Sequence, residues 1–392
     1  MILSSFKYKE KGWELTELSP LQSVNLLVAR NATGKTRTIR ALQNVTSFMQ
    51  MKEVFMGTRT FETTLKFENV RNLDGKMDYS FRINNGVVEK EELFVNGKML
   101  IKRTKATAKY ENQKINPPSE KLVVQIRRDK ELYPEIELLM LWAEGVISVS
   151  CSDINPFTIL SIGKFINPYN FSELVDALSP DEMKKVLATA KELGYSIASI
   201  KTIEATKDVR LVQLKERSIS NEMVDMQLSS GMLRTLYLLC FVSVIKHNKK
   251  LSMLLIDDMG EGLDYRRSID LGKVIFEDCQ QSGLQLVVSS NDAFLMDVVD
   301  ISNWQILRRK GNKVSSINQA MNPDMFRKFR MTGLSNFDLF SSDFIESYLN
   351  QKKFFSVSIL ILMIMSMCNI LFREMRVLQI ISRLSMSTMI IA

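Results

Sequence analysis

An apolar run, then a glycine–lysine–threonine turn, then an amphipathic helix is the sequence feature that most restricts the fold of this chain. Residues 23–28 (SVNLLV) have the length and composition of a buried strand, and Arg37 to Met49 carries apolar residues at helical spacing. Between them lies the segment 29–36, which reads ARNATGKT. A strand, a glycine-containing loop and a helix in this order predict a phosphate-binding loop.

The chemistry of such a loop follows from its backbone. Free N–H groups of the loop and of the helix N-terminus face a bound phosphate, and the helix dipole favours negative charge there. Lys35 can bridge the β- and γ-phosphates of ATP, and the Thr36 hydroxyl can ligate Mg²⁺. The usual pattern starts with glycine where this chain has Ala29, which fits if the φ of Ala29 is negative. The residues expected to contact ATP are Asn31, Ala32, Thr33, Gly34, Lys35 and Thr36.

Two further segments suit the same chemistry. Residues 228–234 (LSSGMLR) open a long apolar helix, and hydroxyls at a helix start cap it while free N–H groups face outward as an anion site. About twenty residues later, Leu254-Leu255-Ile256 is followed by Asp257 and Asp258. An apolar strand that ends in carboxylates is typical of a Mg²⁺ ligand beside a phosphate loop.

Taken together, the phosphate loop, LSSGM, IDDMGEGLD (256–264) and VVSSND (287–292) resemble, in this order, the heads of ABC-type ATPases. The chain is most similar to stand-alone bacterial AAA-type ATP-binding proteins allied to the SMC, RecF and OLD groups, over about residues 1–345. The resemblance implies an α/β fold: a P-loop NTPase head with a mixed sheet flanked by helices, plus an antiparallel β-section and a helical insertion. It also implies at least a homodimer, because the signature segment of such heads acts on the partner's nucleotide.

The resemblance further implies roles for single residues. Asp257 would hold Mg²⁺, Asp258 stands where most such enzymes have the glutamate that orients the attacking water, and Glu261 is a second candidate for that task. Asn291 occupies the place of a histidine that senses the γ-phosphate, and Gln125 matches a glutamine that senses Mg²⁺. The signature residues expected to reach the partner's nucleotide are Ser229, Ser230 and Gly231. Because Asp258 is shorter than glutamate and Asn291 takes up no proton at neutral pH, the rate of hydrolysis is in question.

The predicted function is an ATPase that dimerises on ATP to control a partner. By analogy, a separately encoded effector in a bacterial phage-defence or DNA-maintenance system is the expected partner. One alternative is an ATP-gated DNA clamp of the RecF kind, which would use the basic residues 98–130. The other is an ATP sensor or scaffold without hydrolysis, suggested by Asp258 and Asn291.

Charge and composition set broader limits. The net charge of +8 and the pI of about 9.1 permit an anionic partner, DNA or a membrane surface. A single histidine, His247, disfavours a zinc site and a histidine-activated nucleophile. The four cysteines have no metal-binding spacing and are expected to be reduced core thiols: Cys151, Cys240, Cys279 and Cys368. Without a signal peptide at its start, the chain is predicted to be cytoplasmic.

The remaining sequence divides into an insertion and a tail. Asn85-Gly86 and Asn96-Gly97 lie between β-type runs and predict hairpins, whereas residues 104–120 are expected to form a loop. Helices are expected near 132–142 and 180–193, with strands near 146–151, 197–203 and 209–215. We therefore divide the chain into an ATPase core (1–50 and 221–345), an inserted region (51–220) and a tail (346–392).

A charge-free apolar run of the tail, Phe354 to Phe372, just reaches the length of a membrane span. Three interpretations remain open for it. It is a membrane anchor, a packing or dimerisation helix, or an extension unrelated to the natural domain, such as translation past a frameshift.

Overall fold

The computed structural model describes residues 1–51, 60–70, 75–155, 169–207 and 209–350. The apolar run 354–372 and Cys368 lie outside these residues. None of the helices in the described part of the chain combines the length and the apolar composition that a bilayer crossing needs. The chain separates into two compact units, Met1–Pro323 and Asp324–Ala392.

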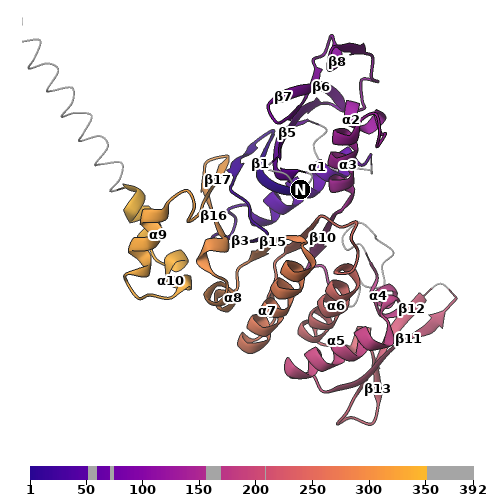
Figure 1. Cartoon of the computed structure of the whole chain (residues 1–392). Helices are drawn as coiled ribbons and strands as arrows, with labels where there is room; N and C mark the ends of the chain where they lie inside the picture. Colours follow the sequence, from indigo (N-terminus) through magenta and orange to yellow (C-terminus); the bar gives the residue numbers. More distant parts are fainter. Residues whose placement is uncertain (52–59, 71–74, 156–168, 208, 351–392) are drawn as a thin grey trace, which may run out of the picture. The chain divides into compact units, whose positions relative to one another are not determined.

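A fourteen-stranded mixed sheet forms the frame of the first unit (Figure 1). Its strand order is β10-β14-β15-β3-β16-β17-β2-β1-β4-β5-β6-β7-β8-β9. In chain order the bounds are β1 (Ile2–Glu10), β2 (Trp13–Leu18), β3 (Val24–Val28), β4 (Phe61–Val70), β5 (Gly75–Asn84), β6 (Val87–Val95), β7 (Lys98–Arg103), β8 (Ala108–Tyr110), β9 (Gln113–Ile115), β10 (Val146–Ser150), β14 (Met253–Asp257), β15 (Gln285–Ser290), β16 (Trp304–Lys310) and β17 (Lys313–Ile317).

Five neighbouring strands, β10, β14, β15, β3 and β16, run parallel to one another. Three of them, β3, β14 and β15, are buried along their whole length, as expected for strands covered on both faces. Met253, Leu255 and Val287 join the core that contains helix α1 (Lys35–Met49) and the β-section. The alternate residues of these strands face the opposite side, which α6 (Ser230–Ile245) and α7 (Tyr265–Ser282) cover (Figure 1).

The antiparallel strands β4 to β9 continue the same sheet outward from β1. Both predicted hairpins are confirmed, because Asn85, Gly86, Asn96 and Gly97 all have positive φ, as a two-residue type I′ turn requires. The loop expected over 104–120 is wrong in part, because β8 and β9 form a short hairpin there. Its polar sequence contains a strand pattern in which Ala108 and Ile115 are buried and Lys109 and Lys114 are exposed.

A second sheet of three strands holds β11 (Ile197–Thr206), β12 (Val209–Glu216) and β13 (Glu222–Val224). Helices α4 (Phe171–Ala177) and α5 (Pro180–Glu192) accompany it. Helix α5 begins where Ser179 and Glu182 form a capping box. The remaining helical elements of the first unit are α2 (Val123–Ile126), α3 (Pro134–Glu144), η1 (Asp225–Gln227), α8 (Ala293–Val298) and η2 (Ile301–Asn303).

The described part of the second unit contains α10 (Asn336–Ser341) and most of α9 (Pro323–Arg330), which starts at the boundary. The Phe329 and Phe344 rings meet edge to face at 5.3 Å.

The three cysteines within the described residues are buried free thiols, as predicted: Cys151, Cys240 and Cys279.

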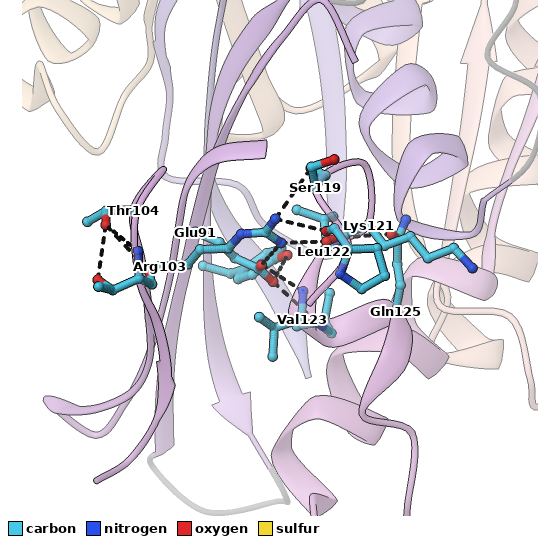
Figure 2. Close-up of polar contacts among 12 residues, drawn as sticks. Glu91, Arg103, Thr104, Ser119, Lys121, Leu122, Val123 and Gln125 are labelled. Atoms are coloured by element: carbon cyan, nitrogen blue, oxygen red, sulfur yellow. Dashed lines mark hydrogen bonds and ion pairs between the residues drawn. The ribbon is translucent and has the colours of Figure 1, made fainter. Parts of the chain in front are cut away.

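A buried carboxylate ties the β-section to α2 (Figure 2). Glu91 of β6 is fully buried and accepts hydrogen bonds from the backbone N–H of Val123 at 2.7 Å and of Val124 at 3.2 Å. It also accepts one from the Tyr79 hydroxyl at 3.0 Å, and the Arg103 guanidinium lies 3.9 Å away. Burial raises the pKa of Glu91 to about 7, although these partners favour its charged form.

This carboxylate makes stability depend on pH. The folded-state pKa of Glu91 lies above the ordinary value of 4.5, so the folded protein keeps a proton that the unfolded chain has released. Its contribution is therefore complete below about pH 4.5 and is lost as the pH rises to about 7, on the order of 3 kcal/mol in all. We expect Glu91→Gln to flatten the free energy of unfolding over this window, measured by urea denaturation at several pH values. An unchanged slope against pH would contradict this assignment.

Candidate nucleotide site

Three strand ends meet at one edge of the sheet. Strand β15 lies between β3 and β14 and is parallel to both, and its last residue, Ser290, is in register with Val28. The phosphate loop leaves β3 at that edge, Asp257 ends β14 there, and Asn291 follows β15. The structure thus brings the phosphate loop together with two segments that lie more than two hundred residues further along the chain.

The phosphate loop turns at two residues. Ala32 and Gly34 have φ values of 60° and 122°, whereas Ala29 lies outside the positive-φ region, as its fit required. A side chain on Gly34 would meet the Trp13 ring, whose Nε1 lies 3.5 Å from the position of a Cβ atom. Arg309 of β16 donates to the Ala32 carbonyl at 3.0 Å. The conformation of the loop is therefore set by its own residues and by contacts with Trp13 and Arg309.

Lys35, the first residue of α1, is 6% exposed. Its Nζ donates to the Ala29 carbonyl at 2.9 Å and to Asn291 Oδ1 at 2.5 Å. Burial lowers the pKa of Lys35, and the charges of Asp258 and Asp257 oppose that shift. The contact with Asn291 places the end of β15 directly against the phosphate-loop lysine.

Ser289 organises the carboxylates at the end of β14. Its hydroxyl donates to Asp257 Oδ1 at 2.5 Å and accepts from the backbone N–H of Asp258 at 2.9 Å. Asp257 is also buried. Because Ser289 holds one of its oxygens, the carboxylate has a fixed orientation. A carboxylate held in this way suits a hard cation.

Asp258 has an unusual backbone and environment. Its φ of 55° lies in the left-handed region, which costs a non-glycine residue free energy. Burial raises the pKa of Asp258, with further contributions from the charges of Asp257 and Glu261. Asp258, Glu261 and Asn291 line one cavity of 430 Å³. All three residues expected to act in hydrolysis therefore face a common space.

The signature segment lies on a different cavity. Ser229 caps α6, accepting from the backbone N–H of Met232 at 3.4 Å, and both Ser229 and Ser230 are exposed. With Gly231 they line a cavity of 390 Å³ that also borders Gly262 and Leu263. The first cavity borders the same two residues, so the segment 258–264 separates the two sites.

Close backbone contact joins the signature segment to the segment 258–264. A Cβ on Gly231 would lie 3.0 Å from the Gly262 carbonyl oxygen. Arg234, one helical turn into α6, donates to the Glu261 carbonyl at 2.7 Å. Sequence reasoning missed Arg234, as it missed Ser289 and Arg309. The sequence offered a clue only for Ser289, which lies at the end of an apolar strand. The hydrogen bonds of Arg234 and Arg309 depend on tertiary contact and leave no pattern in the sequence.

The residues present fit one Mg²⁺ ion held with a nucleotide. No group of three or more His, Cys, Asp or Glu side chains in the described part of the chain could hold a metal ion by itself. Mg²⁺ in such sites takes one or two protein oxygens, with phosphates and water completing its octahedron. The Asp257 carboxylate at the end of β14 and the hydroxyl of Thr36 in α1 are the protein oxygens that we expect to hold such an ion.

Gln125 lies elsewhere, and its expected role at Mg²⁺ is wrong. Its side chain, 8% exposed, donates to the carbonyls of Phe48 at 2.6 Å and Met49 at 3.2 Å and accepts from Leu122 N–H. These carbonyls end α1, whereas the phosphate loop begins it, about 20 Å away at 1.5 Å per residue. The prediction rested on a local pattern, a glutamine that follows an apolar run. A glutamine that binds the carbonyls at the end of a helix gives the same pattern.

We expect Gln125→Ala to act on stability and to leave nucleotide binding unchanged. Losing these hydrogen bonds should destabilise the fold by about 1 to 3 kcal/mol, measured by denaturant unfolding. The affinity for ATP should stay within about twofold of the wild type at a temperature where both proteins are folded. The opposite result, weakened ATP binding with unchanged stability, would return Gln125 to the nucleotide site.

Comparison with solved structures places the fold. An Smc head bound to the C-winged helix domain of ScpA aligns with a TM-score of 0.51 at 12% identity, covering 81% of this chain and 98% of that chain. A Pyrococcus furiosus Smc head domain with an extended coiled coil, bound to the C-terminal domain of ScpA, gives 0.48 at 12% identity and covers 84% and 99%. The SMC head domain from Thermotoga maritima gives 0.44 at 10% identity and covers 81% and 99%.

Sequence comparison adds no relative. No family model matches the chain. No curated protein matches it either. The structural similarity and the large mixed sheet flanked by helices show the fold that the motifs predicted: this chain has the P-loop fold of an ABC-type ATPase head.

Proposed function

We propose that this chain binds ATP with Mg²⁺ at the edge of the sheet where β3, β14 and β15 end, and hydrolyses it slowly. The observation that carries the proposal is the convergence of Lys35, Asp257 and Asn291 on one point. These residues offer a cation, a magnesium ligand and a hydrogen-bonding amide beside a loop of the phosphate-binding type. The fold makes such a site expected, and the side-chain chemistry supports it.

Each residue has a task in this proposal. The backbone N–H groups of residues 31–36 hold the phosphates, and Lys35 exchanges its bonds to Ala29 and Asn291 for phosphate oxygens. Thr36 and Asp257 hold the Mg²⁺, which neutralises charge on the β- and γ-phosphates when bound. The Asn291 amide then hydrogen-bonds the γ-phosphate.

Water activation falls to Asp258, with Glu261 on the same cavity as a second carboxylate. A carboxylate whose pKa is raised by burial and like charges is a better base near neutral pH. Its short side chain and left-handed backbone restrict its reach, and no imidazole stands at Asn291 to take up a proton. These features support slow turnover. A sensor or scaffold without hydrolysis is therefore the second candidate.

A second copy of the chain completes the site. Ser229 and Ser230 are exposed on a cavity of their own, apart from the cavity of Asp258. Serine hydroxyls and helix N–H groups form an anion site, and the γ-phosphate on a partner head is the anion that would fill it. ATP thereby becomes the bridge between two heads, and closure of the dimer depends on it.

Dimer closure is proposed to control a separately encoded effector. One Smc head to which this chain is similar was solved in complex with a domain of ScpA, which supports a protein partner for a head of this fold. A bacterial phage-defence or DNA-maintenance system is the setting we propose, by analogy with stand-alone ATP-binding proteins. Co-purification with the products of neighbouring genes would test this setting.

Lys35→Ala and Asp257→Asn test the site. We expect Lys35→Ala to weaken ATP binding about 10- to 100-fold, because a charged hydrogen bond to phosphate is lost. Asp257→Asn should abolish the Mg²⁺ dependence of binding, measured by calorimetric titration with and without EDTA. Lys98→Ala, an exposed lysine paired with Glu111, is the matched control and should bind like the wild type. If wild-type phosphate release is no faster than in the two site variants, hydrolysis is excluded.

Mixed dimers test action in trans. Ser229→Arg and Lys35→Ala should each give an inactive homodimer, the first through its signature and the second through its phosphate loop. When the two are co-expressed, heterodimers regain one intact composite site, so activity should return to about a quarter of the wild-type value. Failure to recover any activity, with heterodimers isolated by two affinity tags, would contradict the action of Ser229 on the partner's nucleotide.

A further inference from the structure

A cavity of the β-section stands apart from the proposed nucleotide site. Its volume is 550 Å³, larger than the 430 and 390 Å³ of the two cavities beside the segment 258–264, and it shares no lining residue with them. Its walls are the turn between β5 and β6, the start of β6, the connection from β7 to β8 and the segment 115–119. We call it the β-section cavity. Sites for small molecules have volumes of about 300 to 1,000 Å³, so this one is of the usual size.

Arg103, the last residue of β7, supplies a buried cation to this cavity (Figure 2). The residue is 5% exposed. Its Nη1 donates to the Lys121 carbonyl, and its Nη2 donates to the carbonyls of Pro118 at 2.9 Å and Ser119 at 3.3 Å. Its ion-pair partner, Glu91 Oε2, lies 3.9 Å from Nη1, which is beyond hydrogen-bond distance. Because burial also raises the pKa of Glu91 to about 7, this partner compensates the charge of Arg103 only in part.

One N–H group of Arg103 is left for a ligand. The three carbonyls take their hydrogen bonds from Nη1 and Nη2, whereas Nε donates to no residue in the described part of the chain. A nitrogen without a partner is either buried or open to solvent. Arg234 Nε is a buried example, and Arg103 Nε is not. The Arg103 Nε–H is therefore open to solvent, and the β-section cavity is the space that this side chain lines.

The other charged residues of the cavity neutralise each other. Lys105 Nζ lies 2.8 Å from Glu89 Oε1, and the Asn84 amide donates to the same oxygen at 2.7 Å. Hydrogen bonds from Lys105 and Asn84 lower the pKa of Glu89, so its carboxylate stays ionised and engaged. Among the described lining residues, Arg103 thus provides the positive charge that no carboxylate meets within hydrogen-bond distance.

We propose that the β-section cavity binds a small molecule whose phosphate or carboxylate group accepts a hydrogen bond from Arg103 Nε. Hydrogen bonds between a guanidinium and such an anion are about twice as strong as those between neutral groups. The Thr104 and Thr107 hydroxyls, 3.1 Å apart on the same cavity, suit the polar remainder of the ligand. The surroundings also attract anions, because residues 98–130 hold ten basic and three acidic residues.

Other ligand classes fit less well. A metal ion needs several oxygen ligands, but Glu89 is engaged, and no group of three or more His, Cys, Asp or Glu among the described residues could hold one. A ligand recognised through an aromatic ring needs a ring to pack against, and the described lining contains none. A compact polar anion is the class that these walls favour.

Binding of the anion would stabilise the folded protein. Arg103 also holds the carbonyls of the segment 118–121, which leads into α2. Negative charge placed beside Arg103 therefore strengthens the joint between the β-section and α2. Thermal stability is a readout of this site that needs no catalytic assay.

Thermal unfolding of the full chain without nucleotide tests the proposal, with inorganic phosphate, malonate and sodium chloride compared at equal ionic strength. Phosphate or malonate should raise the unfolding midpoint in a saturable way, with half-saturation on the order of 1 mM, as expected for a single charged contact. Stronger stabilisation by phosphate assigns a phosphorylated ligand, and stronger stabilisation by malonate assigns a carboxylate. Equal stabilisation by all three salts would overturn the proposal, because screening alone then explains it.

Two variants locate the anion. Ala106→Trp fills the cavity from an exposed position, leaves the hydrogen bonds of Arg103 in place and should raise the half-saturation concentration about tenfold. Arg103→Lys keeps the charge but removes the Nε–H, and it should weaken binding to a similar extent. If Arg103→Lys does not fold, Ala106→Trp decides the question alone. An unchanged half-saturation concentration in Ala106→Trp would contradict the site.

Two controls match these variants. Ala205→Trp makes the same substitution at an exposed position of β11 and should bind the anion like the wild type. Lys35→Ala removes the phosphate-loop lysine and should also keep the stabilisation. Loss of the effect in Lys35→Ala, with retention in Ala106→Trp, would assign the anion to the phosphate loop and end the proposal. Because the assay contains no ATP, its outcome is independent of the proposed ATPase function.

Discussion

The parallel register of β3, β15 and β14 is the constraint on which the site depends. Each strand alone is a short buried segment of five or six residues. Side by side in the same direction, they bring the phosphate loop, Asn291 and Asp257 to one edge. The central strand, β15, makes contacts with residues of both neighbouring strands. Ser289 then fixes Asp257, and Asn291 reaches Lys35. A slip of β15 by one residue would turn both contacts to the other face.

How much of this could be predicted depends on the range of the interaction. The phosphate loop, the two Asn-Gly hairpins and the capped helix α5 follow from neighbouring residues, and the sequence alone located them. Residues 104–120 were predicted as a loop because two short strands with exposed lysines have the composition of a loop. Gln125 misled because its partners, the carbonyls that end α1, are some 76 residues distant in the chain. Arg234 and Arg309 bind backbone carbonyls of loops, which no side-chain motif records.

The electrostatics of the site favour an incoming anion with its metal. Lys35 is buried near two carboxylates. Burial lowers the pKa of Lys35 and raises the pKa of Asp258, and both shifts favour the neutral forms. Desolvated charges of this kind stabilise one another only in part. A triphosphate with Mg²⁺ would give Lys35 a stronger partner than the Asn291 amide and would give Asp257 a cation. The proposed nucleotide therefore relieves costs that the described protein bears alone.

The segment 258–264 has a place in both cavities, and this shapes how two heads would communicate. Its first residue carries the carboxylate that we propose to activate water, while Gly262 lies close to Gly231 and the Glu261 carbonyl accepts a hydrogen bond from Arg234. Glycine on glycine leaves no flexible side chain to absorb a shift, and Arg234 fastens the segment to α6. In the proposed dimer, a displacement of the signature segment by the partner's nucleotide would reach Asp258 through the close approach of Gly231 to Gly262 and through the hydrogen bond from the Arg234 side chain to the Glu261 carbonyl. A base whose backbone is already strained is sensitive to such a shift, so each head's hydrolysis would follow the occupancy of the other.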